Sequence, residues 1–254
     1  FLFGLLCQIL CILCVKIQTL FLAAHLQICN SVFLGKDGCL LIIKPFLLIR
    51  GEGVRRIQVK DGITNRNGKS VEQLFNEYER DFIVQSVVKQ HERMAALNPA
   101  SVNTIRLLTY RHDMEVSLLY AVIRIGRAGQ CIDNESAGGI STLINPDGTL
   151  GKYAFGAPGY DKVEKTDSGI TLEGYLIPSF NEVVETAKRL HFNLPHFNIA
   201  AWDFAVGEDG RPVFIEWNAD PDLSQSAFGP GFGENPKDFL KEIYQQRNTR
   251  HSYW

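Results

Sequence analysis

The sequence predicts an α+β protein built around a mostly antiparallel sheet. Apolar runs of strand length recur from Asp37 onward. Several of them are joined by short turns that contain Gly or Asp, which is typical of β-hairpins. Between them stand stretches whose apolar residues recur at helical spacing. Strands linked as hairpins, with helices between them, favour an α+β architecture over an alternating parallel one.

The first half of this pattern consists of three expected strands and one helix. A continuous apolar run bounded by turn residues indicates a buried strand, and a second strand returns after a glycine-containing loop. Ser70 and Gln73 have the spacing of a capping box, which opens a helix. The expected strands are Cys39–Lys44, Val54–Val59 and Phe82–Val88.

The second half predicts two hairpins with a helix between them. Ser179 and Glu182 have the spacing of another capping box, and the helix that it opens presents an apolar face. Pro236 suits the first position of a closing helix. The expected strands are Thr104–Arg111, Glu115–Gly126, Trp202–Val206 and Pro212–Trp217.

Composition and charge exclude several classes of protein. The 254 residues are 45% hydrophobic and 21% charged, which argues against a disordered, collagen-like or coiled-coil chain. The formal charge of −2 provides no broad positive surface, so we expect no nucleic-acid partner. Three of the six cysteines lie in the apolar run of residues 1–15. We interpret these cysteines as small buried hydrophobic residues in preference to zinc ligands or members of a disulfide framework.

The N-terminal 24 residues leave two interpretations open. About 20 apolar residues suffice to span a bilayer, but Lys16, Gln18 and Thr19 interrupt this run. A buried segment is the first interpretation, and a membrane anchor formed by residues 1–24 is the second. No positively charged start or small-residue cleavage site marks a signal peptide. We expect a cytoplasmic protein, with membrane association if the second interpretation holds.

Oxygen donors gather in the last predicted hairpin. Asp203 lies on its first strand, and Glu216 and Asn218 lie on its second. Side chains alternate between the two faces of a strand, so Glu216 and Asn218 point the same way. Carboxylate and amide oxygens suit Mg²⁺, which would also offset the repulsion between two carboxylates held close together. The alternative is an ordinary hairpin whose polar residues face solvent.

A second candidate feature lies at the end of the first strand. Lys44 precedes Pro45 and is followed by a loop that contains Gly51 and Gly53. A lysine at this place can reach a phosphate as a point charge, and the glycines allow close backbone approach. The loop matches neither the Walker A sequence nor the Rossmann fingerprint. The alternative is a lysine that simply ends a strand in solvent.

Together these features resemble the ATP-grasp superfamily. Its pattern is Lys-Pro before a flexible glycine loop, a hinge strand that holds adenine, and a late Asp…Glu-x-Asn metal cluster. A closer resemblance, over residues 37–235, is to the sugar-transfer-associated ATP-grasp family. It is carried by the NTIR sequence that ends at Arg106, by DNESAGGI at Asp133–Ile140, and by the segment from Ile177 to Asn218.

The resemblance implies roles for individual residues. Lys44 would contact the ATP phosphates, and Arg106 would stabilise developing charge on the transferred phosphate or on an acyl phosphate. The metal ligands would be Asp203, Glu216 and Asn218. The nucleotide-binding residues, with Gln90 or His91 near the ribose, would be Lys44, Gln85, Ser86, Val88, Gln90, His91, Asn134, Gly138 and Gly139.

The same resemblance implies an ATP- and Mg²⁺-dependent ligase related to glutamate ligases. It would activate a carboxylate as an acyl phosphate, which an amine or similar nucleophile on a saccharide or its precursor then attacks. Two alternatives stay open. One is a small-molecule kinase that uses the same nucleotide site. The other is a catalytically impaired nucleotide-binding protein, which the unusual glycine loop IRGEGVRRI favours.

The expected fold is the ATP-grasp fold, in which mostly antiparallel sheets enclose a nucleotide site. We expect residues 1–36 to form an apolar N-terminal segment and residues 37–92 a nucleotide-binding lid subdomain. Residues 93–254 would then form the catalytic and metal-binding subdomain. ATP-grasp enzymes usually carry a subdomain of about a hundred residues before the Lys-Pro strand, so we expect a truncated N-terminal subdomain here.

Overall fold

The computed structural model describes residues 39–45, 55–77, 82–112, 114–127, 133, 138–156, 162–219, 221, 237, 240–241 and 244. They belong to two compact units, one before Val88 and one from Val88 onward. The expectations for residues 1–36, Gly51, Gly53, Asn134 and Pro236 lie outside the described residues. Within the described ranges, no helix is both long and apolar enough to cross a bilayer.

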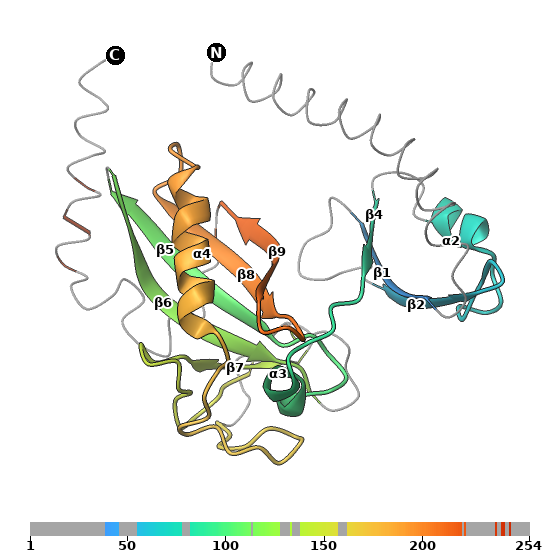
Figure 1. Cartoon of the computed structure of the whole chain (residues 1–254), viewed down its shortest axis with the longest axis horizontal. Helices are drawn as coiled ribbons and strands as arrows, with labels where there is room; N and C mark the ends of the chain where they lie inside the picture. The colour runs from blue at the N-terminus through green and yellow to red at the C-terminus, as the bar shows by residue number, and fades with distance from the viewer. Residues whose placement is uncertain are drawn as a thin grey trace, which may run out of the picture. The chain divides into compact units, whose positions relative to one another are not determined.

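The first unit is a four-stranded antiparallel sheet with one helix. Its strands follow the order β3-β2-β1-β4, with β4 beside the strand that carries Lys44 (Figure 1). Helix α2 (Val71–Glu77) buries Val71 and Leu74 against Ile43 and Ile57 of the sheet. The strands are β1 (Cys39–Pro45), β2 (Arg55–Lys60), β3 (Ile63–Thr64) and β4 (Phe82–Ser86).

The second unit is a five-stranded antiparallel sheet in the order β7-β6-β5-β8-β9. The short helix α3 (Glu92–Leu97) precedes it, and helix α4 (Phe180–Phe192) lies across one face, as Figure 1 shows. Both sheets confirm the antiparallel α+β prediction, and the predicted strands differ from the observed ones mainly at their ends. The strands are β5 (Thr104–His112), β6 (Glu115–Ile125), β7 (Ile140–Leu143), β8 (Ile199–Val206) and β9 (Pro212–Asn218).

Only one of the two expected capping boxes forms. Ser70 Oγ accepts a hydrogen bond from the Gln73 N–H at 3.1 Å, and Gln73 Oε1 accepts one from the Ser70 N–H at 3.0 Å. Ser179 instead has φ 54° and ψ 24°, and its side chain makes no capping bond. A capping side chain needs extended backbone at its own residue. The box expected from Ser179 and Glu182 is therefore wrong, although helix α4 does begin there.

The chain joins the second unit before α3 begins. The His91 N–H donates to the Val206 carbonyl oxygen at 2.9 Å, and the Glu208 N–H donates to the Lys89 carbonyl oxygen at 2.9 Å. These bonds attach residues 89–91 to the β8–β9 turn. The observed division at Val88 therefore falls earlier in the chain than the expected boundary after residue 92.

The two faces of the larger sheet differ in chemistry. The face under α4 holds the main core, in which Val183 and Ala187 of the helix pack with Ile123, Trp202 and Phe204 of the strands. The opposite face has a small apolar cluster and, beside it, the charged residues of the candidate site. This apolar cluster consists of Leu108, Tyr120, Val122 and Ala201.

Candidate active site

One row of polar residues crosses the face of the larger sheet that is opposite α4. Arg106 on β5 is paired in register with Asp203 on β8, and Asp203 is paired with Glu216 on β9. Asn218 lies two residues beyond Glu216 and is paired with Ala201. Residues directly opposite each other in antiparallel strands share a face. The sheet thus brings Arg106 to the predicted hairpin cluster across 97 residues of sequence.

Asp203 is the centre of this row. Its side chain is 0% exposed, so its charge must be met within the protein. Arg106 binds it with two bonds, from Nε to Oδ1 at 2.8 Å and from Nη2 to Oδ2 at 2.6 Å. Arg124 Nη2 lies 3.1 Å from the same Oδ2. Burial alone would raise the pKa of Asp203, but Arg124 and Arg106 outweigh it and hold this pKa below its ordinary value.

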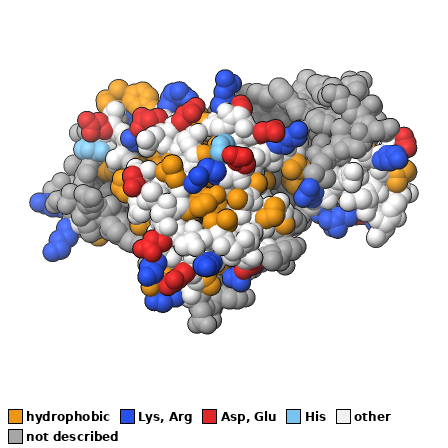
Figure 2. Space-filling view, turned by 60° about the horizontal axis from the view of Figure 1, so that its bottom comes forward, with side chains coloured by type: hydrophobic (Ala, Val, Ile, Leu, Met, Phe, Trp, Pro, Cys, Tyr) orange, Lys and Arg blue, Asp and Glu red, His pale blue; other side chains and the backbone are white. Residues whose placement is uncertain are grey.

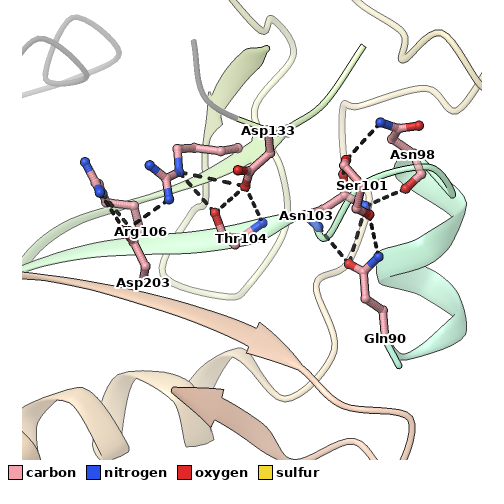
Figure 3. A network of polar contacts seen from close by, with 9 residues as sticks. Gln90, Asn98, Ser101, Asn103, Thr104, Arg106, Asp133 and Asp203 are labelled. Atoms are coloured by element: carbon pink, nitrogen blue, oxygen red, sulfur yellow. Dashed lines mark hydrogen bonds and ion pairs between the residues drawn. The ribbon is translucent and has the colours of Figure 1, made fainter. Parts of the chain in front are cut away.

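A second set of contacts extends from Arg124 to Thr104 and Asp133, and Figure 3 labels the last two of these residues. Arg124 Nε donates to Thr104 Oγ1 at 3.0 Å, and the Thr104 hydroxyl donates to Asp133 Oδ2. The Thr104 N–H also donates to this oxygen, at 3.0 Å. Burial raises the pKa of Asp133, against the opposing effects of Arg124 and Thr104. Two guanidinium groups and two carboxyl groups are thereby brought together, and all of them except the partly exposed Arg106 are buried.

Gln90 and His91, expected near a ribose, both bind the protein's own backbone. Gln90 Nε2 donates to the Ser101 carbonyl oxygen at 2.7 Å, and Gln90 Oε1 accepts a bond from the Asn103 N–H at 2.7 Å (Figure 3). His91 Nδ1 accepts a bond from the Arg93 N–H at 3.1 Å, which caps helix α3. Both side chains therefore hold the backbone between α3 and β5 or at the start of α3. Their contact with nucleotide stays a prediction.

The other predicted nucleotide residues lie in both units. Gln85 and Ser86 form the exposed end of β4, and Val88 follows it at the start of the second unit. The backbone of Lys44 lies in β1 opposite Ile83, while its side chain is outside the described residues. Gly138 has φ 90°, and a Cβ there would meet nothing within 4 Å, while Gly139 is buried directly before β7.

The donor set of the hairpin fits Mg²⁺. Glu216 is exposed and Asn218 is half-buried on the same face, so both offer accessible oxygens. A carboxylate has about four lone-pair sites, and the arginines occupy three of those of Asp203. Asp203 is also 0% exposed, so the accessible oxygens of the row are those of Glu216 and Asn218. No three His, Cys, Asp or Glu side chains of the described ranges cluster as metal ligands, so the predicted site depends on the Asn218 amide.

Sequence reasoning missed part of this network. Neither Thr104 nor Arg124 is among the site residues that the sequence predicts. Arg124 is paired with Thr104, but the pairing depends on a bulge where Leu108 is opposite Tyr120 and Thr109 is opposite Leu118. Counting from the hairpin turn without this bulge would pair Thr104 with residue 123. It would then place Arg124 on the opposite face of the sheet.

Comparison with known proteins identifies the family. A family model described as sugar-transfer associated ATP-grasp matches residues 19–238. Among solved structures, the L-amino acid ligase from Bacillus licheniformis is similar with a TM-score of 0.40 and 13% sequence identity. That similarity covers 76% of this chain but 34% of the ligase. A search of curated proteins gave no match. Because the family model spans most of the sequence, the chain belongs to the sugar-transfer-associated ATP-grasp family and has its expected ATP-grasp fold.

Proposed function

We propose that the protein is an ATP- and Mg²⁺-dependent ligase that activates a carboxylate as an acyl phosphate for attack by an amine or similar nucleophile. Family membership supports ATP-dependent ligase chemistry in general. The observation that carries the proposal is the row of Arg106, Asp203 and Glu216 with Asn218 on one face of the sheet.

Arg106 is suited to stabilise a phosphoryl group during transfer. Such transfer depends on positioning and on neutralisation of charge more than on covalent chemistry by the protein. The two bonds to Asp203 use the Nε and one Nη of Arg106, so other N–H groups of this guanidinium can donate to a phosphoryl oxygen. Burial would lower the pKa of Arg106, but Asp203 outweighs burial and raises it. The side chain therefore carries a fixed positive charge.

The remaining residues would bind nucleotide and metal. Glu216 and Asn218, with Asp203 behind them, would hold Mg²⁺, which when bound offsets negative charge on the phosphates. Lys44 would contribute a further positive charge at the phosphates, as the family resemblance implies. Gln85, Ser86 and Val88 would meet the adenine edge.

We propose a small molecule or a saccharide, or its precursor, as the acceptor. The family description, which names sugar transfer, supports this choice. On the face drawn in Figure 2, Lys and Arg side chains are interspersed with Asp and Glu. The described residues of that face therefore form no continuous basic surface of the kind that nucleic acid requires. We place the reaction in the cytoplasm, and membrane association through residues 1–24 stays a prediction.

The first test measures ADP release with candidate carboxylate and amine pairs. Glu216→Gln should lower ADP release by about ten- to a hundredfold, because it removes the accessible carboxylate of the row. Glu208→Gln is the matched control, since Glu208 is also an exposed glutamate of the β8–β9 hairpin but lies in its turn. Full ADP release by Glu216→Gln would contradict the assignment of this residue.

A second test separates the ligase from its alternatives. Hydroxylamine added during turnover should trap an acyl phosphate as a hydroxamate. A stable phosphorylated acceptor with no hydroxamate would instead indicate a small-molecule kinase. Binding of Mg-ATP in calorimetry without ADP release would indicate an impaired nucleotide-binding protein. If Mg-ATP neither binds nor raises the melting temperature, the proposed function is wrong.

A further inference from the structure

We propose that Asp133, Thr104 and Arg124 are positioning residues for Arg106. In this arrangement they hold Asp203, the counter-ion of Arg106, in the orientation that lets Arg106 bind a phosphoryl group. That Arg106 binds a phosphoryl group rests on the proposed function. The effect of the three residues on Arg106 itself can be measured without nucleotide.

The direction of each hydrogen bond shows how the effect is transmitted. Arg124 Nε donates to the Thr104 hydroxyl oxygen at 3.0 Å. The hydroxyl proton of Thr104 is therefore directed to Asp133 Oδ2, its acceptor. With Nε fixed in this way, Arg124 presents Nη2 to Asp203 Oδ2 at 3.1 Å. This is the oxygen that also accepts the 2.6 Å bond from Arg106. Asp133 thus acts on Arg106 through Thr104, Arg124 and Asp203.

Burial makes each of these contacts hard to replace with water. The exposed fractions are 0% for Asp203, 5% for Thr104, 7% for Arg124 and 8% for Asp133. The charges of the two arginines and the two aspartates offset one another in this buried group. Without the contacts of Asp133 and Thr104, Arg124 would turn more fully toward Asp203 and compete with Arg106 for the same oxygen.

Asp133 also lies shortly before Gly138 and Gly139, which are a second predicted part of the site. The Thr104 N–H donates to Asp133 at 3.0 Å, which attaches the chain at residue 133 to the first residue of β5, two residues before Arg106. The family resemblance places Gly138 and Gly139, a few residues further on, beside the phosphates. The same contact thus sets the position of Arg106 and the start of this segment.

The test compares two threonines that each lose a buried hydroxyl bond. Thr104→Val removes the link in the network. Thr142→Val is the control, because Thr142 lies in the same sheet and donates to the Tyr153 carbonyl oxygen at 2.8 Å, outside the network. Thr104→Val should weaken Mg-ATP binding in calorimetry about tenfold, and Thr142→Val should stay within about twofold of the parent. Thr104→Ser keeps the hydroxyl and should restore the affinity.

A measurement without nucleotide separates this inference from the proposed function. Hydrogen exchange at Arg106 Nε, followed by NMR, should be about tenfold faster in Thr104→Val than in Thr142→Val, since the bond to Asp203 is weakened. Asp133→Asn, which keeps the side-chain shape, should have the same effect if Thr104→Val does not fold. Unchanged exchange in these variants would overturn the inference. Absence of Mg-ATP binding by the parent, with faster exchange in Thr104→Val, would contradict only the proposed function.

Discussion

Replacement of Asp203 by Asn tests the electrostatics of the candidate site most directly. The substitution keeps the shape of the side chain but removes its charge. Asp203 is fully buried, and each of its oxygens accepts a bond from a guanidinium group. An amide has one oxygen and one NH₂ group, so its NH₂ would face the N–H groups of Arg106 or Arg124. The variant therefore loses a counter-ion and places donors opposite donors.

The expected loss of unfolding free energy is about 3–5 kcal/mol, because removal of one partner leaves buried charge uncompensated. Two features keep the loss within this range although two arginines are affected. Asp133 Oδ2 lies 3.9 Å from Arg124 Nε, and Glu216 attracts Arg106. For a chain of this size, the loss corresponds to a melting temperature lower by about 6–20 °C.

Asp133→Asn is the matched control, since it makes the same change in the same network. Burial raises the pKa of Asp133, so the folded protein favours its ionised form less than it favours ionised Asp203. We therefore expect a smaller loss, below about 2 kcal/mol at neutral pH. Urea denaturation of both variants measures the difference. A loss for Asp203→Asn equal to or below that for Asp133→Asn would refute Asp203 as the central counter-ion.

The pH dependence has a defined sign. The pKa of Asp203 is lowered in the folded state, so the unfolded state binds more protons as the pH falls below the ordinary carboxyl value of about 4. The stabilisation from Asp203 is thus complete above that value and is lost as the pH falls through the lower folded pKa. The difference between the parent and Asp203→Asn should be full at about pH 7 and should narrow below about pH 4.

Two further predictions concern other parts of the structure. Burial lowers the pKa of His191, whose Nε2–H donates to the Phe197 carbonyl oxygen at 3.0 Å while Nδ1 accepts from the Thr109 hydroxyl. The unfolding free energy in urea should therefore fall from about pH 7.5 to about pH 5.5 in the parent, and less in His191→Gln. Ser70→Ala should cost about 1 kcal/mol and Ser179→Ala less than about 0.3 kcal/mol, because the Ser70 side chain caps helix α2 whereas the Ser179 side chain makes no capping bond. Equal shifts of the denaturant midpoints would contradict the second prediction.

The sequence was sufficient for the local parts of the fold. The last hairpin, for example, combines two apolar strands with a turn in which the Gly207 N–H bonds the Arg211 carbonyl oxygen and Gly210 has φ 78°. Turn residues and apolar runs encode such a unit directly. The capping boxes show the limit of local patterns. Ser70 and Ser179 have equivalent spacing, but only the structure shows that the backbone at Ser179 is left-handed.

From strand patterns alone, the candidate site was predictable only where its residues share a hairpin, and Arg106 was assigned to it only through the family resemblance. Glu216 and Asn218 follow from alternation along one strand, whereas the pairing of Arg106 with Asp203 joins segments far apart in sequence. The place of Arg124 depends on one bulged residue in β6. No turn or glycine signals that bulge, and a one-residue shift exchanges the two faces of a strand. The network around Asp203 was therefore beyond the reach of sequence patterns.

The structure also distinguishes among the three predicted metal ligands, which sequence reasoning treated alike. Asp203 is fully buried between two guanidinium groups, while Glu216 is exposed in the same row. Within the row, Arg106 offsets the charge of the buried Asp203, so the exposed carboxylate of Glu216 gives the row its net negative charge. A divalent cation would thus be attracted chiefly by Glu216, whereas Asp203 chiefly fixes Arg106. Substitution of Glu216 should therefore affect cation binding more than folding, and substitution of Asp203 should affect both.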